Sequence, residues 1–136
     1  MLKEMAPYLH FKGEAAQAAA FYEATLGARV DALMRWGEMP GQDLPPELAD
    51  HVMHGCMHIG DHQLNMSDVP PQFYDRMSGN GHILLEFEDA DELERRFHAL
   101  AEGGEVTMPL EDTFWNARYG ELRDRFGVHW KFNCQR

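Results

Sequence analysis

The fold is decided by residues 7–27, which read PYLHFKGEAAQAAAFYEATLG. Over residues 8–11 the side chains alternate between polar and apolar, which is the period of a strand with one buried face. Lys12 and Gly13 interrupt this pattern, and residues 14–26 then carry apolar side chains at the spacing of an amphipathic helix. Gly27 supplies the residue type that commonly ends a helix. The segment therefore predicts a strand followed directly by a helix.

A second segment repeats this order. Residues 82–87 (HILLEF) have the pattern of a strand, and residues 89–102 have that of a helix ending before the glycine pair 103–104. When the two segments are aligned, they agree at five landmarks: Leu9 with Leu85, Phe11 with Phe87, Phe21 with Phe97, Gly27 with Gly103, and Val30 with Val106. Because strand, helix and glycine stop agree together, we interpret the chain as an internal duplication.

Three further strands are predicted in each half. In the first half they are 30–36, 52–59 and 63–67, and the Pro/Gly-rich acidic loop 37–50 is a candidate lid or partner contact. In the second half they are 106–108, stopped by Pro109, then 119–124 and 129–133. We expect an α+β fold in a single domain, 1–136. Its two βαβββ modules, 1–68 and 82–136, are joined by a linker at 69–81, and their curved mixed sheets enclose a cleft with the helices outside.

Composition narrows the class of function. The chain has 136 residues, with 12 Lys and Arg against 23 Asp and Glu, for a net charge of −11. A surface this acidic repels phosphate backbones and anionic lipids, so we expect neither a nucleic-acid nor a membrane partner. Two cysteines, Cys56 and Cys134, are too few for a disulfide framework, and residues 1–5 show no signal-peptide pattern. These features predict a cytoplasmic protein with reduced thiols.

Four stretches carry a family resemblance. They are residues 7–13 with 21–22 and 26–28, residues 52–55 (VMHG), residues 60–61 with 64–68 (GD, LNMSD), and residues 124–130 (DRFGVHW). Together they resemble the vicinal-oxygen-chelate superfamily of glyoxalase and bleomycin-resistance proteins, and within it the PhnB-like branch. The resemblance covers nearly the whole chain. It implies the glyoxalase fold and a homodimer whose modules pair within one chain or are exchanged between two.

Strand alternation selects the candidate site residues. If the apolar side chains of each strand face the helices, the intervening polar ones face the cleft. The predicted ligand-binding residues are His10, His54, Asn65, His82, Glu86 and Lys131, with Trp115 at the mouth. Because Glu86 and Lys131 carry opposite charges in a partly desolvated space, we also expect them to form an ion pair.

The usual metal site of the superfamily is predicted to be absent. The resemblance assigns its ligand positions to residues 6–8, Asn65, His82 and Lys131, and only His82 is a good ligand for a divalent cation. Two other arrangements stay open. His10, His82 and Glu86 could converge on a divalent metal, and a helix over residues 51–62 would align four histidines, although the glycines there favour a hairpin.

The leading functional hypothesis is therefore a small organic ligand held in a polar cleft, with no cofactor expected. The alternative is a lyase, isomerase or dioxygenase that depends on a divalent metal, in which the metal would polarise two neighbouring substrate oxygens. Acid–base chemistry by a cleft histidine without a metal is a third hypothesis.

Overall fold

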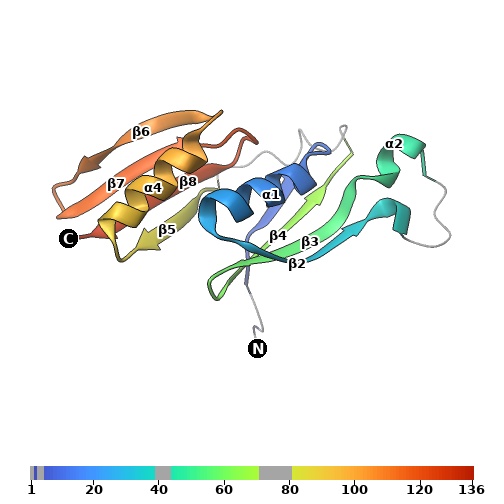
Figure 1. Ribbon diagram of the computed structural model, residues 1–136, viewed down its shortest axis with the longest axis horizontal. Helices are drawn as coiled ribbons and strands as arrows, with labels where there is room; N and C mark the ends of the chain where they lie inside the picture. Colours follow the sequence, from blue (N-terminus) through green and yellow to red (C-terminus); the bar gives the residue numbers. More distant parts are fainter. Residues whose placement is uncertain (1, 3–4, 39–43, 71–80) are drawn as a thin grey trace. The chain divides into compact units, whose positions relative to one another are not determined.

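A computed structural model describes residues 2, 5–38, 44–70 and 81–136 (Figure 1). The chain divides into two compact units, Met1–Gly79 and Asn80–Arg136. Each described unit contains one four-stranded mixed sheet with a helix lying across one face. Most of the predicted linker, residues 71–80, and residues 39–43 of the predicted lid loop lie outside the described residues.

The first unit follows the predicted βαβββ order. Its strands are β1 (Tyr8–Phe11), β2 (Arg29–Arg35), β3 (Val52–Ile59) and β4 (His62–Asp68), arranged as β1-β4-β3-β2. Helix α1 (Ala15–Leu26) follows β1, and two short helices, η1 (Trp36–Glu38) and α2 (Pro46–Ala49), lie between β2 and β3. β1 pairs in parallel with β4, whereas β3 pairs antiparallel with both β4 and β2. The β3–β4 hairpin replaces the alternative helix over residues 51–62.

The second unit repeats the arrangement. Its strands are β5 (Ile83–Phe87), β6 (Glu105–Asp112), β7 (Ala117–Arg123) and β8 (His129–Gln135), in the order β5-β8-β7-β6. Helix α4 (Ala90–Ala101) follows β5, and β5 pairs in parallel with β8. The predicted α+β fold with two βαβββ modules is confirmed.

The two main helices begin in different ways. Asp89 caps α4 locally, because its side chain accepts a hydrogen bond from the backbone N–H of Asp91 at 3.2 Å. At the start of α1, the Ala15 N–H is instead bound by the carboxylate of Asp68, at the end of β4, at 3.0 Å. α1 ends at Gly27, whose φ of 69° is the left-handed conformation that glycine adopts at little cost.

Each core lies between a sheet and its helix. Phe11 and Met66 of the first sheet are buried with Tyr22 of α1, and Trp130 and Phe132 of the second sheet are buried, as is Phe97 of α4. Phe97 and Phe132 meet edge to face with ring centroids 5.2 Å apart. The alternation of apolar residues therefore identified the helix-covered face of each sheet.

The predicted end of β6 is wrong, whereas the other strand bounds differ from the predicted ones by at most two residues. β6 does not stop at Pro109 but continues to Asp112. Proline is tolerated there because β6 is an edge strand, and its pairing with β7 shifts register on both sides of Met108. Within the described part of the chain, no helix is long and apolar enough to span a membrane.

Candidate functional site

The candidate site residues lie on the face of each sheet opposite its helix, which we call the helix-free face. Residues that oppose one another in a ladder project to the same side of a sheet. Tyr8 opposes Asn65, and Asn65 in turn opposes Cys56, which places these three side chains together. In the second unit, Glu86 opposes Asn133 and Asn133 opposes Tyr119.

Histidines dominate the first helix-free face. The Tyr8 hydroxyl is hydrogen bonded to His54 Nδ1 at 3.0 Å, and the His10 ring stacks on Tyr8 with centroids 5.1 Å apart. Ser67 Oγ lies 3.4 Å from His10 Nδ1. Because His10 is partly buried, desolvation lowers its pKa below 6.5, so the neutral imidazole is favoured. A neutral imidazole can both donate and accept a hydrogen bond.

A second row of contacts on this face involves amides. Gln63 donates from Nε2 to Asn65 Oδ1 at 3.0 Å. Gln63 therefore holds the Asn65 side chain from the same strand. The Asn65 amide nitrogen is a hydrogen-bond donor on the same helix-free face as the other polar groups.

Charged residues dominate the second helix-free face. Asn133 donates from Nδ2 to both carboxylate oxygens of Glu86, at 3.1 and 3.0 Å. The Tyr119 hydroxyl donates to Glu121 Oε2 at 3.0 Å. Burial and the Glu121 carboxylate raise the pKa of Tyr119 above 10, while nearby Lys131 opposes this shift. Tyr119 thus keeps its proton at neutral pH and remains able to donate it in a hydrogen bond.

An aromatic side chain borders this charged row. Trp115 lies between β6 and β7 and packs edge to face on Tyr119, with ring centroids 5.6 Å apart. Its side chain remains 43% exposed. It therefore offers a flat apolar surface beside Tyr119.

The predicted site residues fall into two groups. His10, His54 and Asn65 belong to the first helix-free face. Glu86 and Lys131 belong to the second, with Trp115 beside it. His82 directly precedes β5, and its ring stacks on His129 of β8. In each unit, the alternation along the strands correctly predicted which side of the sheet these strand residues face.

The predicted Glu86–Lys131 ion pair is wrong. In the part of the chain that the structure describes, Glu86 is bound by Asn133, and Lys131 lies beside Tyr119 instead. The sequence reasoning also missed Tyr119 and Glu121 as site residues. Their alternation with buried Gly120 and Leu122 along β7 is the signal that would have identified them.

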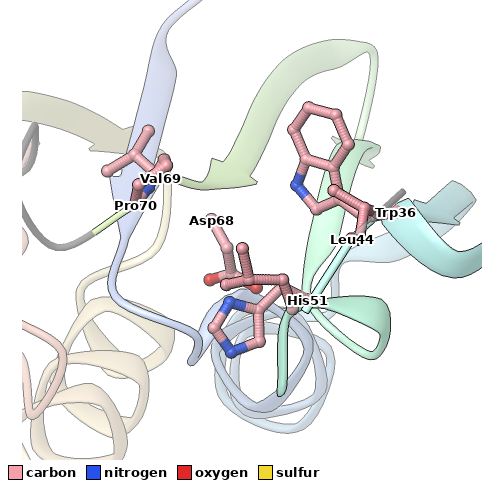
Figure 2. A pocket seen from close by; sticks show the side chains of 7 residues that line it. Trp36, Leu44, His51, Asp68, Val69 and Pro70 are labelled. Atoms are coloured by element: carbon pink, nitrogen blue, oxygen red, sulfur yellow. The ribbon is translucent and has the colours of Figure 1, made fainter. Parts of the chain in front are cut away.

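The first unit also has a small pocket at one end of its sheet (Figure 2). Its volume is about 120 Å³, and its lining residues are mostly apolar: Trp36, Leu44, Leu48, His51, Asp68, Val69 and Pro70. Both carboxylate oxygens of Asp68 are used structurally, by the N–H groups of Ala15 and Val52 at 3.0 and 2.8 Å. Ligand pockets are typically several times larger, at about 300–1,000 Å³, so we do not place the ligand here.

Comparisons with known proteins agree with this architecture. The model of the Glyoxalase/Bleomycin resistance protein/Dioxygenase superfamily matches residues 6–132. Protein YjdN of Escherichia coli K12 is 32% identical over 140 residues, which cover 95% of this chain and 93% of that protein.

Solved structures show the same fold. PA1353 from Pseudomonas aeruginosa is 37% identical with a TM-score of 0.87, covering 98% of both chains. A PhnB protein from Bacillus cereus is 24% identical with a TM-score of 0.78, covering 97% of this chain and 99% of that one. The fosfomycin resistance protein FosX of Listeria monocytogenes is 11% identical with a TM-score of 0.68, covering 100% and 95%, and shares the fold alone.

Proposed function

The chain belongs to the glyoxalase/bleomycin resistance protein/dioxygenase superfamily, and we propose that it binds a small organic ligand on its helix-free faces. The ligand carries an acidic or paired-oxygen group that interacts with Lys131 and an apolar part that contacts Trp115. In the second unit, His82 and Glu86 are the other proposed ligand-binding residues. In the first unit, His10, His54 and Asn65 are the proposed ligand-binding residues of its own helix-free face.

The observation that supports this proposal is that the helix-free faces carry both polar and apolar side chains. Polar side chains that are held by hydrogen bonds alternate there with large apolar side chains that are 40% to 52% exposed: Tyr8, Met34, Leu84, Met108 and Trp115. A ligand site of this kind needs apolar surface for affinity and a few fixed polar groups for orientation. Lys131 supplies a cation, which suits an anionic oxygen of the ligand.

The residues at the usual metal positions favour a ligand site without the superfamily's common metal. Those positions offer the Tyr8 phenol, the Asn65 amide, the His82 imidazole and the Lys131 ammonium, and an ammonium repels a divalent cation. Two residues of the alternative metal set, His82 and Glu86, also make other contacts. His82 stacks on His129 with centroids 4.8 Å apart, and Asn133 occupies both oxygens of Glu86. No contact among the described residues favours metal-dependent lyase, isomerase or dioxygenase chemistry at His10, His82 and Glu86.

Ligand-observed NMR against a panel of small aromatic carboxylates and phosphonates tests the proposal. We expect a subset of the anionic compounds to bind wild-type protein, and Lys131→Met to weaken that binding at least tenfold, the equivalent of about 1.4 kcal/mol. Lys12→Met is the matched control, because it removes the same charge from an exposed position after β1. Equal binding by wild type and Lys131→Met would contradict the assignment.

A further inference from the structure

We propose that Asp31, Cys56 and His58 form a binding site for one divalent transition-metal ion, for which Zn²⁺ is the best chemical fit. One possible ligand atom from each of these side chains lies within 4.8 Å of the other two. All three residues belong to the first unit, and none occupies a position that the superfamily resemblance assigns to its usual metal. The inference does not depend on the organic ligand proposed above.

A bulge in the first sheet brings the three residues together. Along the β2–β3 ladder, Val30 opposes Met57 and Ala32 opposes Cys56, so Asp31 is the extra residue on β2. Cys56 and His58 are two residues apart on β3 and therefore project to one face. The bulge places Asp31 in contact with this pair, and its Oδ2 meets His58 Nδ1 directly.

The chemistry of the set matches zinc. A carboxylate oxygen, a thiolate sulfur and an imidazole nitrogen are the three donor types that Zn²⁺ accepts, with bonds of about 2.0–2.3 Å. Donors around a tetrahedral ion are roughly 3.3–3.8 Å apart, which is inside the 4.8 Å span of the three ligand atoms. The Asp31 and His58 side chains are 30% and 28% exposed, which gives a metal ion access from solvent.

Surrounding groups support the ligands. Arg29 donates from Nε to Asp31 Oδ1 at 2.8 Å, which holds the carboxylate while its second oxygen stays directed at His58. On binding, the metal would replace the hydrogen bond between Asp31 and His58, and the Cys56 thiol would release its proton to solvent. The net charge of −11 attracts cations to the protein.

Three protein ligands leave one coordination position of a tetrahedral ion open. Asn65, which opposes Cys56 in the ladder, lies on the same side of the sheet as this protein ligand. A water molecule or an oxygen of a ligand can occupy the open position, which is the arrangement of zinc sites that act on substrates rather than sites that only stabilise a fold.

The full chain, purified without a histidine tag and titrated with Co²⁺, tests the site by absorption spectroscopy. Thiolate coordination produces a ligand-to-metal charge-transfer band in the near ultraviolet, and we expect this band to saturate at one ion per chain. Cys56→Ser should abolish it, whereas Cys134→Ser should retain it, because the buried Cys134 belongs to the other unit. Absence of the band in wild type, or its persistence in Cys56→Ser, would overturn the proposal.

Thermal unfolding with Zn²⁺ gives a second measurement that does not depend on the cysteine variant. A metal that binds only the folded state raises the midpoint of unfolding. We expect Zn²⁺ to raise it in wild type and in His62→Gln, and to have no such effect in His58→Gln or Asp31→Asn. His62 is an exposed histidine on the neighbouring strand. Equal zinc stabilisation of all four proteins would refute the assignment, whatever the outcome with organic ligands.

Discussion

Trp130 donates its indole Nε1–H to Oδ2 of Asp124 at 2.9 Å, and both side chains are buried. The other carboxylate oxygen of Asp124 accepts from the backbone N–H groups of Phe126 and Val128, at 2.9 and 3.0 Å. One carboxylate thus closes the turn between β7 and β8 and positions a large side chain of the second core.

Replacement of Asp124 by alanine should therefore destabilise the protein strongly. The Asp124→Ala variant leaves the indole N–H and two turn N–H groups without their acceptor, and a buried donor without an acceptor costs about 1–3 kcal/mol. We expect the free energy of unfolding in urea to fall by about 3 kcal/mol. Asp61→Ala, at an exposed turn, is the control and should change it by less than about 0.5 kcal/mol. A similar loss in both variants would contradict the role of Asp124.

Gly104 should not tolerate a side chain. A Cβ at Gly104 would lie 2.8 Å from the backbone carbonyl carbon of Asp124 and closer still to the carbonyl oxygen of Arg123. Because backbone atoms cannot move away cheaply, Gly104→Ala should lower the free energy of unfolding by about 2 kcal/mol. In Gly81→Ala the new Cβ meets no atom within 4 Å, so this variant should match wild type or gain up to about 1 kcal/mol. The two alanine variants can be compared in one urea denaturation series.

Stability should depend on pH through His10. Desolvation lowers the pKa of His10 in the folded state below 6.5, so between the two values the unfolded chain binds more protons. The contribution of His10 is thus present above pH 6.5 and is lost as the pH falls through the folded-state pKa. His10→Gln should lose less stability than wild type when the pH is lowered from about 8 to about 5. His62→Gln is the exposed control, and a His10→Gln curve parallel to that of wild type would exclude this role.

The protein should form a homodimer. The helix-free faces expose apolar side chains such as Leu84 and Met108, and the edge strands β2 and β6 leave ladder groups uncovered, so association would bury both kinds of surface. Light scattering at physiological ionic strength should give twice the 15.6 kDa mass of one chain. A mass of one chain across micromolar concentrations would contradict this expectation.

Much of the fold was predictable because the patterns are local. The alternation over 52–59 predicted β3 with its observed bounds, and Gly27 marked the end of α1. Pro109 misled the prediction because a proline signals the end of a strand only where the ladder needs its N–H, and an edge strand does not.

The candidate site was less predictable because its contacts join distant residues. The partner of Glu86 is Asn133, which lies on the adjacent strand β8 but 47 residues away in the sequence, and charge alone favoured Lys131. Asp31 joins Cys56 and His58 only through a bulge, and a bulge interrupts the period on which the assignment of faces depends. The Asp68 carboxylate that binds the start of α1 is 53 residues away in the sequence, so no local capping pattern predicted this contact.

The strand order has a consequence for synthesis on the ribosome. In each unit the last strand to be made, β4 or β8, is an inner strand and bridges the first strand to the others. Neither sheet can be completed until its last strand has left the exit tunnel. The first strand of each unit therefore pairs only late in synthesis, with a partner distant in the sequence, as expected of a topology with high contact order. Because β4 is complete before β5 begins, the first sheet can fold while the second is still being translated, and the two halves mature in sequence.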